Sequence, residues 1–516
     1  MTVIIEKVRQ EIPGWCYVWT KLGYFILSCM NVPYIYFLEN VGITIKPLQL
    51  HWFTTAFNRS VTKWALWRPK FFKIWFTVGV IVVGLLLLPS IFLLISTLVN
   101  HFRPVQEQTV QALQPVVPGI NLPMKELSCY FFTLLMASII HEAGHAIAAV
   151  KEDVHVNGLG FLLMFILPGA YVDVPTEEIR TLTPFRQLKI LCAGVWHNIV
   201  LVLLALGIGL STPFFLQPFY LHGHGLTVMQ LTQDSPARGP TGLEVGDVIT
   251  SVNKWTVASI VDWRHYLIKS ISSDQMGFCV PESVVHTYDE TIHHEAASDS
   301  FFGHLSRLYS KSKAFEGADG SVQCCSGDSD AHLCFELMED KELDTGVAAM
   351  QPFSCLPARM AVSMSTKTCI NSRSCPTDTH CLAPSLKNAS RLLQISRRGI
   401  NGKHKEDVLY LGPPVYLYHT VTLTSYIPKF SFLSLTWPNT IEVYCDYMVK
   451  FSGALAVLNM VPVVYLDGYW IFGAVIDLFL APWCDQVTRK IIHVIVTIIG
   501  TMLLFSNILI GVWSII

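Results

Sequence analysis

The chain has 516 residues, of which 52% are hydrophobic and only 14% are charged. Soluble domains carry about a quarter charged residues, so this composition excludes an ordinary soluble protein and predicts a polytopic α-helical protein embedded in a lipid bilayer. The formal net charge of −2 excludes the strongly basic character that is typical of nucleic-acid-binding domains, and we expect no nucleic-acid partner.

The N-terminal region, residues 1–73, gives conflicting signals about its side of the membrane. Residues 17–38 are apolar and aromatic but include Lys21, so they form either a first span or an interfacial segment. Basic residues gather towards the end of this region, which favours the cytosolic side. A glycosylation sequon begins at Asn58, and a glycan would need the lumenal side. The sequence leaves this conflict open.

Residues 74–220 form the first part of the predicted membrane core. Residues 76–99 and 190–216 are apolar and long enough to cross about 30 Å of hydrocarbon. Residues 158–173 are short for a full span and contain a Pro-Gly pair. They predict a re-entrant hairpin or sheet-like element packed against a site, because non-helical backbone at membrane depth must be covered by protein or line a water cavity. Residues 180–189 predict a polar turn.

The pentapeptide HEAGH, residues 141–145, lies in an apolar segment that predicts a helix over residues 126–150. On a helix, His141 and His145 leave one face a single turn apart. Two imidazoles at that spacing can bind one Zn²⁺, and Glu142 between them can take a proton from a water. Ionisable groups in such a helix are costly and rarely occur without a function, so we expect a metal site here rather than a chance match.

The span at residues 190–216 carries three further polar or small residues, Gly194, His197 and Asn198. For His197 we prefer a hydrogen-bonded position between helices to a role as a metal ligand, because buried polar groups usually find partners. Asn198 lies one turn after Gly194. A small residue there lets a neighbouring helix approach while the Asn198 amide reaches the site.

Residues 221–447 form the predicted extramembrane region. Residues 228–257 predict a strand, a Ser-Pro-Ala turn, a short helix and a second strand in GLEVGDVITSVN. This pattern resembles part of a PDZ domain, which recognises peptides by β-augmentation; the alternative is a generic pair of β-hairpins. Residues 408–425 alternate apolar and polar side chains and predict later strands of the same domain.

A cysteine-rich stretch, residues 279–381, is predicted to be inserted in that domain. It holds eight of the fourteen cysteines. An even, dense set of cysteines in a polar stretch indicates a disulfide framework in an oxidising lumen. The alternative, a zinc ribbon, is disfavoured because no pair of CxxC motifs occurs. A sequon at Asn388 follows the cluster, and we expect it to be glycosylated.

Residues 448–516 complete the predicted membrane core. Residues 449–470 are apolar but interrupted by Asn459, Pro462 and Asp467, and residues 491–516 form a final span. Pro462 breaks the helix because it cannot donate a backbone hydrogen bond. Asp467 then lies at membrane depth, where an unpaired carboxylate is costly. A catalytic zinc normally has three protein ligands, which favours Asp467 as the third; a helix cap or an interhelical hydrogen bond are the alternatives.

These motifs together resemble the site-2 protease family of intramembrane metalloproteases. HEAGH in an apolar helix is followed by a PDZ-like segment and then by the Asn459–Pro462 stretch with Leu-Asp-Gly ending at residue 468. The resemblance implies a polytopic α-helical membrane protein with an inserted PDZ-like α+β lumenal domain. It implies one Zn²⁺ per chain, with His141, His145 and Asp467 as ligands.

The resemblance also implies roles for the remaining residues. Glu142 is the implied catalytic residue, and Asn198 and Asn459 are implied hydrogen-bond donors to the substrate or the transition state. The implied substrates are membrane-anchored transcription factors, namely sterol regulatory element-binding proteins and ER-stress factors. They are cut first in the lumen and then within a transmembrane helix, in Golgi and endoplasmic reticulum membranes.

Two other functions are weighed against this one. A membrane protease that processes prenylated CAAX proteins also places HExxH near a membrane, but the PDZ-like segment and the Leu-Asp-Gly motif argue against it. A membrane scaffold or receptor with a PDZ-like peptide-binding domain and a non-proteolytic zinc site is the alternative from another class. Structural zinc sites usually have four protein ligands, and the sequence offers no evident fourth.

Overall fold

A computed structural model describes residues 41–101, 124–164, 167–272, 275–291, 315–316, 322–325, 331–338, 353–386 and 389–513. The candidate first span at residues 17–38 lies outside these ranges. The chain divides into two compact units. We call Met1–Ser211 with Ile441–Ile516 the membrane unit, and Thr212–Thr440 the strand-rich unit.

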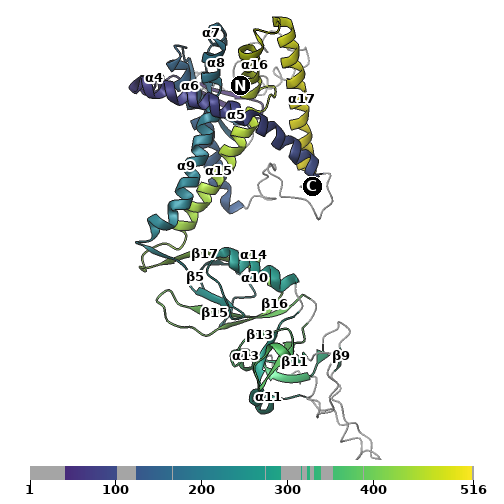
Figure 1. The fold of residues 1–516 in the computed structure, drawn as a ribbon. Helices are drawn as coiled ribbons and strands as arrows, with labels where there is room; N and C mark the ends of the chain where they lie inside the picture. Colours follow the sequence, from purple (N-terminus) through teal and green to yellow (C-terminus); the bar gives the residue numbers. More distant parts are fainter. Residues whose placement is uncertain are drawn as a thin grey trace, which may run out of the picture. The chain divides into compact units, whose positions relative to one another are not determined.

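Long apolar helices make up most of the membrane unit (Figure 1). Its helices are α4 (Asn58–Trp67), α5 (Pro69–His101), α6 (Leu127–Lys151), α7 (Thr176–Thr181), α8 (Pro184–Leu191), α9 (Ala193–Leu216), α15 (Trp437–Met460), α16 (Asp467–Leu480) and α17 (Gln486–Trp513), with a 3-10 turn η2 (Met124–Glu126). Four stretches in the described part of the chain are long and apolar enough to cross a membrane: Pro69–Asn100, Leu127–Lys151, Ala193–Leu216 and Gln486–Trp513. This arrangement fits a polytopic membrane protein.

Residues 180–189, predicted as a polar turn, are instead largely helical, and that prediction is wrong. They contain the end of α7 and most of α8. Two apolar side chains of α8, Leu188 and Ile190, are buried, and between them the ammonium of Lys189 pairs with the buried Glu152 carboxylate at 2.9 Å. Ile190 therefore belongs to α8, and the following helix begins at Ala193.

A four-stranded antiparallel sheet accompanies the helices of the membrane unit. Its strands are β1 (Ile43–Lys46), β2 (Gln49–Thr54), β3 (Gly158–Met164) and β4 (Leu167–Asp173), in the order β1-β2-β3-β4. The sheet-like form predicted for residues 158–173 is confirmed by β3 and β4. The strands β1 and β2 were not predicted, because β2 joins the sheet through β3, which lies far away in the sequence, and local polarity does not reveal it.

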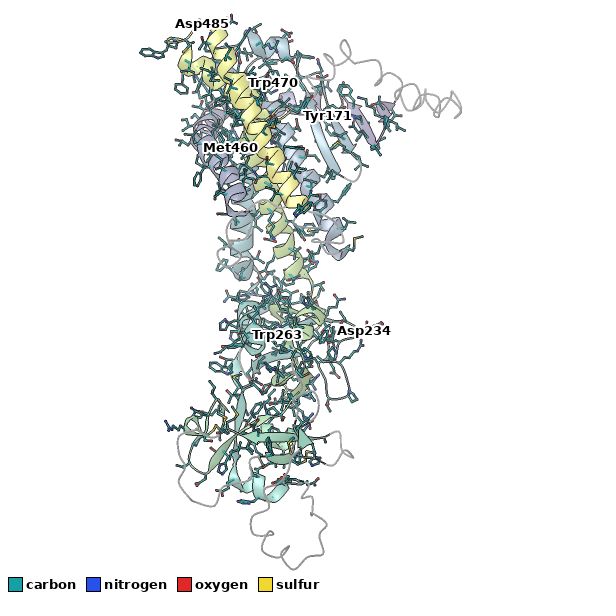
Figure 2. The ribbon with its side chains drawn as sticks, turned by 90° about the vertical axis from the view of Figure 1, so that its right-hand side faces the viewer. Tyr171, Asp234, Trp263, Met460, Trp470 and Asp485 are labelled. Atoms are coloured by element: carbon teal, nitrogen blue, oxygen red, sulfur yellow. A yellow bond between two sulfur atoms is a disulfide. The ribbon has the colours of Figure 1, made fainter. Side chains whose placement is uncertain are left out.

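The predicted break in the helix at residues 449–470 is confirmed. The helix α15 ends at Met460, labelled in Figure 2, and α16 begins at Asp467. Pro462 lies in the connection, and Tyr465 adopts a left-handed backbone with φ of 75°. A non-glycine residue in that region is strained, which marks a tight turn immediately before Asp467.

An antiparallel sheet and two helices form the first part of the strand-rich unit. The strands are β5 (Tyr220–Leu231), β6 (Val248–Val252), β7 (Trp255–Thr256), β15 (Arg391–Arg398), β16 (Val408–Gly412) and β17 (Val421–Pro428), and the helices are α10 (Ile260–Ser272) and α14 (Pro414–Thr420). The order along the sheet is β16-β15-β6-β5-β17, with β7 on β6. Trp263, labelled in Figure 2, lies in its core.

Two details of this sheet differ from the sequence analysis. The short helix predicted after the Ser-Pro-Ala turn is absent; the segment forms turns closed by Arg238 N–H to Ser235 O at 3.0 Å and Leu243 N–H to Ala237 O at 2.8 Å. Its prolines and glycines prevent a regular helix. Residues 408–425 supply β16 and β17 as predicted, but the unpredicted helix α14 separates the two strands.

Asp247 is the most deeply buried carboxylate of this sheet, at 1% exposure. Arg397 Nη1 lies 2.5 Å from its Oδ2, and Lys405 Nζ lies 2.7 Å from its Oδ1. Burial alone would raise the pKa of this carboxyl, but hydrogen bonds from Lys405, the Glu244 backbone and Arg397 outweigh burial and lower the pKa below its usual value.

The cysteine-rich stretch forms a second sheet of the same unit. Its strands are β8 (Gly277–Pro281), β11 (His332–Leu337), β12 (Phe353–Pro357), β13 (Thr368–Cys369) and β14 (Thr379–Pro384), in the order β12-β11-β14-β8-β13. Two further strands, β9 (Phe315–Glu316) and β10 (Val322–Gln323), pair with each other, and α11 (Glu282–Tyr288), α13 (Ala358–Ser363) and a 3-10 turn η3 (Ser372–Ser374) complete it.

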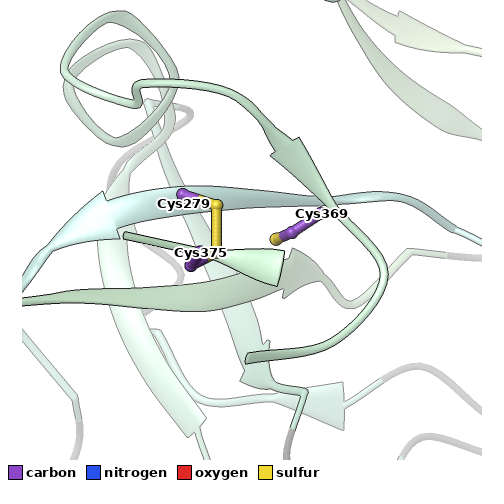
Figure 3. A group of neighbouring side chains, drawn as sticks. All are labelled: Cys279, Cys369 and Cys375. Atoms are coloured by element: carbon purple, nitrogen blue, oxygen red, sulfur yellow. A yellow bond between two sulfur atoms is a disulfide. The ribbon is translucent and has the colours of Figure 1, made fainter. Parts of the chain in front are cut away.

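All eight cysteines of residues 279–381 are paired, which confirms the predicted disulfide framework. The pairs are Cys279–Cys375, Cys324–Cys334, Cys325–Cys355 and Cys369–Cys381. Figure 3 shows the first of these bonds with Cys369 beside it. The sequence alone could not assign the pairing, because the partners come together only through strand order.

Candidate metal centre

The helix α6 buries both histidines of HEAGH. His141 is 4% exposed and His145 is 8% exposed. Small residues dominate the buried surface of this helix near the histidines, including Ala146, Ala148 and Ala149, so that neighbouring elements approach its backbone closely. The sequence thus places two imidazoles in an apolar interior without any bulky neighbour on the same face.

Three side-chain atoms converge between α6 and the start of α16. His141 Nε2 lies 2.8 Å from Asp467 Oδ2, and His145 Nε2 lies 3.2 Å from the same oxygen. The two Nε2 atoms are 3.2 Å apart. Asp467, the residue that follows the helix break, therefore reaches the two histidines despite its distance along the chain.

Each imidazole also makes a contact through Nδ1, the ring nitrogen that faces away from Asp467. His145 Nδ1 lies 2.8 Å from the backbone oxygen of Ile190. A carbonyl oxygen only accepts, so His145 Nδ1 carries the hydrogen and its Nε2 presents a lone pair inward. His141 Nδ1 lies 3.1 Å from the side-chain amide of Asn198 on α9.

The donor set fits a zinc ion. Ligand atoms about 2.0–2.1 Å from a tetrahedral zinc lie about 3.3 Å from one another, close to the observed spacings of 2.8 to 3.2 Å. Two neutral imidazole nitrogens facing one carboxylate oxygen would repel each other without a proton or a cation between them. His141, His145 and Asp467 accordingly form a group that could hold a metal ion.

Close helix packing around this group depends on two glycines. A Cβ atom on Gly194 would stand 2.3 Å from His145 Nε2 and 2.6 Å from His141 Nε2. A Cβ atom on Gly144, within HEAGH, would stand 2.6 Å from His197 Nδ1. All three distances are shorter than real Cβ atoms show, so α6 and α9 can cross here only with glycine at both positions.

Glu142 lies beside the group and faces β4. Its Oε2 accepts a hydrogen bond from the backbone N–H of Val172 at 3.0 Å. One turn earlier on α6, Ser138 Oγ accepts from the Ala170 N–H at 2.7 Å. The edge strand β4 is thereby fastened to α6, and the carboxylate of Glu142 is held in a defined direction.

The other predicted residues take distinct positions. Asn459 is 7% exposed on the last turn of α15, and its side chain makes no hydrogen bond within the described part of the chain. His197 lies between helices, as predicted: its Nδ1 donates to Ala193 O at 2.7 Å, and its Nε2 accepts from Trp75 Nε1 at 3.4 Å. Sequence analysis missed the roles of Ile190 O and Val172 N–H, because backbone groups leave no residue-type signal.

Of the two glycosylation sequons, the structure describes the one at Asn58. Asn388 lies outside the described residues. Asn58 Nδ2 donates to Val156 O at 3.1 Å and to Asn157 O at 3.0 Å. A glycan would replace one of the two hydrogens on this nitrogen and break at least one of these bonds, which disfavours modification of Asn58.

Known proteins resemble the chain over the region that contains this group. The model of peptidase family M50 matches residues 129–505. The membrane-bound transcription factor site-2 protease homolog of Arabidopsis thaliana is 25% identical over 467 residues, which cover 84% of this chain and 86% of that protein. An uncharacterized protein of Methanocaldococcus jannaschii is 24% identical over 207 residues, which cover 38% of this chain and 50% of that protein.

The matched region spans both HEAGH and the helix that begins at Asp467. The family match, its extent and the convergence of the three side chains point to the same conclusion. The chain belongs to peptidase family M50, the site-2 protease family of metalloproteases.

Proposed function

We propose that this protein is an intramembrane zinc endopeptidase that cuts a peptide bond within transmembrane helices. In this proposal His141, His145 and Asp467 hold one Zn²⁺ and Glu142 is the catalytic residue. The observation that carries it is the convergence of the three side-chain atoms within 3.2 Å, beside Glu142 and on a helix apolar enough to cross a membrane.

A bound zinc ion supplies Lewis-acid polarisation of the scissile carbonyl and lowers the pKa of water to near neutrality. Glu142 takes the proton of the attacking water and delivers it to the leaving nitrogen. The Val172 N–H holds the Glu142 carboxylate in place. Asn459, whose amide is unpaired within the described residues, can donate a hydrogen bond to the substrate backbone.

The location of the group determines the kind of substrate. The histidines lie inside an apolar helix, so the bond to be cut must enter the bilayer core. A helical substrate protects its carbonyls by backbone hydrogen bonds, and it must unwind locally before attack. Substrate helices that contain glycine, proline or Asn-Pro should therefore be preferred, because these residues weaken a helix.

The proposed substrates are membrane-anchored transcription factors, namely sterol regulatory element-binding proteins and ER-stress factors, which have first been cut in the lumen. The second cut releases their cytosolic domains. We place the protein in Golgi and endoplasmic reticulum membranes. The support is the printed name of the Arabidopsis thaliana relative, a membrane-bound transcription factor site-2 protease homolog, together with the disulfides of residues 279–381, which suit an oxidising lumen.

We further propose that the sheet of β5, β6, β15, β16 and β17 is a PDZ-like lumenal domain that favours pre-cut substrates. Its support is the GLEVGDVITSVN pattern and a sheet with open edges at β16 and β17, to which a peptide strand can add. Deletion of residues 225–257 in a variant that still folds should let uncut substrates be cleaved. Unchanged selectivity for pre-cut substrate would remove the gating role.

The substitution Glu142→Gln tests the proposed chemistry. It keeps the size of the side chain and removes the base, so cleavage of a transmembrane substrate should fall on the order of 10³-fold while zinc content and folding stay unchanged. Cleavage retained by this variant would remove Glu142 from the mechanism. Absence of cleavage by the unmodified, zinc-loaded protein would favour the alternative function, a membrane scaffold or receptor with a non-proteolytic zinc site.

A further inference from the structure

We infer that Asn198 is a positioning residue whose side-chain oxygen accepts a hydrogen bond from His141 Nδ1–H and thereby fixes the ring that presents Nε2 to the metal. This inference rests on the proposed zinc site. It gives Asn198 a different role from the substrate contact that the family resemblance implies.

The first observation is the contact itself. The amide nitrogen of Asn198 stands 3.1 Å from His141 Nδ1. Asn198 is 0% exposed, so neither group can turn to solvent for a partner. The residue projects from α9 one turn after Gly194, which is the position where α9 touches both histidine rings. The side chain of Asn198 thus contacts His141 on the side of the ring that faces away from Asp467.

The second observation is an unsatisfied atom. Asn198 Oδ1 is buried and has no hydrogen-bond partner while the amide nitrogen faces the ring. The two orientations of an amide have the same shape, and the hydrogen-bond demand of the neighbour decides between them. Turning the amide by half a rotation brings Oδ1 to His141 Nδ1 and puts Nδ2 where Oδ1 stood without a partner, so the site accepts either orientation and the needs of the ring decide between them.

The chemistry of His141 selects that orientation. Its Nε2 points at Asp467 Oδ2 and at the other Nε2, at 2.8 and 3.2 Å. If Nε2 is to bind a metal ion it must carry a lone pair, and in a neutral imidazole the hydrogen is then on Nδ1. An Nδ1–H group needs an acceptor, and the amide oxygen is the atom of Asn198 that can accept.

The same arrangement occurs at the second histidine. His145 Nδ1 donates to the carbonyl oxygen of Ile190 at 2.8 Å. Outer hydrogen bonds of this kind fix the tautomer and the orientation of a metal-binding histidine, and their loss typically costs about 10- to 100-fold in metal affinity or activity. The two imidazoles would then be held in the same way, one by a backbone oxygen and one by the Asn198 oxygen.

Zinc affinity of the purified full-length protein in lipid nanodiscs, measured by competition with a chelator, tests this inference. Asn198→Leu removes the acceptor and should weaken zinc binding by about 10- to 100-fold. Asn198→Asp keeps an acceptor at the same place and should bind zinc at least as tightly as the parent. Asn507→Leu is the control, since it removes the amide of another membrane helix that bonds Thr97 Oγ1 and Leu94 O, and its zinc affinity should equal that of the parent.

The outcomes test the positioning role of Asn198 and the proposed zinc site separately. Unchanged zinc affinity in Asn198→Leu, with normal folding, would overturn the positioning role. Loss of zinc in Asn198→Asp would also overturn it, because it would show that the amide nitrogen, not the oxygen, faces the ring. If Asn198→Leu does not fold, the Asp variant alone decides. Failure of the parent protein to bind zinc would instead overturn the proposed function.

Cleavage measured with excess zinc gives a second readout. A positioning role predicts that added zinc restores much of the activity of Asn198→Leu. A direct substrate contact predicts a lowered kcat/KM that zinc does not restore, together with parental zinc affinity, and that combination would contradict the inference.

Discussion

The membrane unit and the strand-rich unit each hold an aspartate, Asp467 part-buried and Asp247 buried, and the surroundings of the two carboxylates differ. Asp247 is flanked by two cations, Arg397 at 2.5 Å and Lys405 at 2.7 Å. Asp467 faces two imidazoles, at 2.8 and 3.2 Å, and among the described residues no lysine or arginine pairs with it. The first carboxylate finds its cations within the chain, whereas in our proposal the second is completed by a bound zinc ion.

This difference predicts that Asp247 supports the stability of the fold, whereas Asp467 supports metal binding and catalysis. Removing a carboxylate that is paired inside the protein leaves its partners buried and destabilises the fold. Removing a group that serves a bound metal should cost metal affinity and activity first. The two units should therefore respond to matched substitutions in opposite ways.

The largest expected effect is on the membrane unit, from Gly194→Ala. The added methyl group would occupy space 2.3 Å from His145 Nε2, so zinc should be lost and cleavage should fall on the order of 10³-fold, as expected when the metal chemistry is removed. Zinc content and cleavage of a transmembrane substrate measure this. Gly207→Ala on the same helix is the control, because a Cβ there meets nothing within 4 Å, and it should retain both. Normal zinc content in Gly194→Ala would contradict the packing described here.

A smaller effect is expected in the strand-rich unit, from Asp247→Asn. Removing one partner of a buried ion pair should lower the free energy of unfolding of this unit by about 3 kcal/mol. Pulse-labelling hydrogen exchange of β6 at increasing urea measures it. Asp234→Asn is the control, because Asp234 is exposed (Figure 2). Zinc content should be unchanged in both variants, and loss of zinc in Asp247→Asn would break the separation between the two units.

The smallest expected effect is a dependence on pH carried by the same aspartate. The pKa of Asp247 is lowered in the folded protein, so the folded state holds its carboxylate more strongly than the unfolded state does. Its contribution is complete above the unfolded-state pKa of about 3.9 and is lost as the pH falls through the lower folded pKa. The urea midpoint of β6 should fall with acid more steeply in the parent than in Asp247→Asn. Parallel curves would contradict the ion-pair account.

Much of the candidate site could be predicted because its chemistry leaves a local signal. Two histidines one turn apart in an apolar helix are energetically unfavourable, which indicates that the pair has a function. A proline and an aspartate in another apolar stretch mark a broken helix with a carboxylate at its new start. The sequence could accordingly name His141, His145 and Asp467, and the fold brings these three together.

The rest depends on contacts that no local pattern reports. The strand β2 exists because it pairs with β3, which follows α4, α5 and α6 in the sequence. Lys189 could be buried in α8 because Glu152 meets it, so a stretch that looked like a turn is helical. The contact between Asn198 and His141 requires the crossing of α6 and α9, and a single asparagine in a span does not reveal which ring it meets.

The zinc content of purified full-length protein, measured for the parent and for Asp467→Ala, tests the central claim most directly. We predict one zinc ion per chain in the parent. We predict loss of most of it in Asp467→Ala, because a catalytic zinc normally needs three protein ligands and only two would remain. A parent without zinc, or an Asp467→Ala variant that binds zinc as tightly as the parent, would contradict the claim.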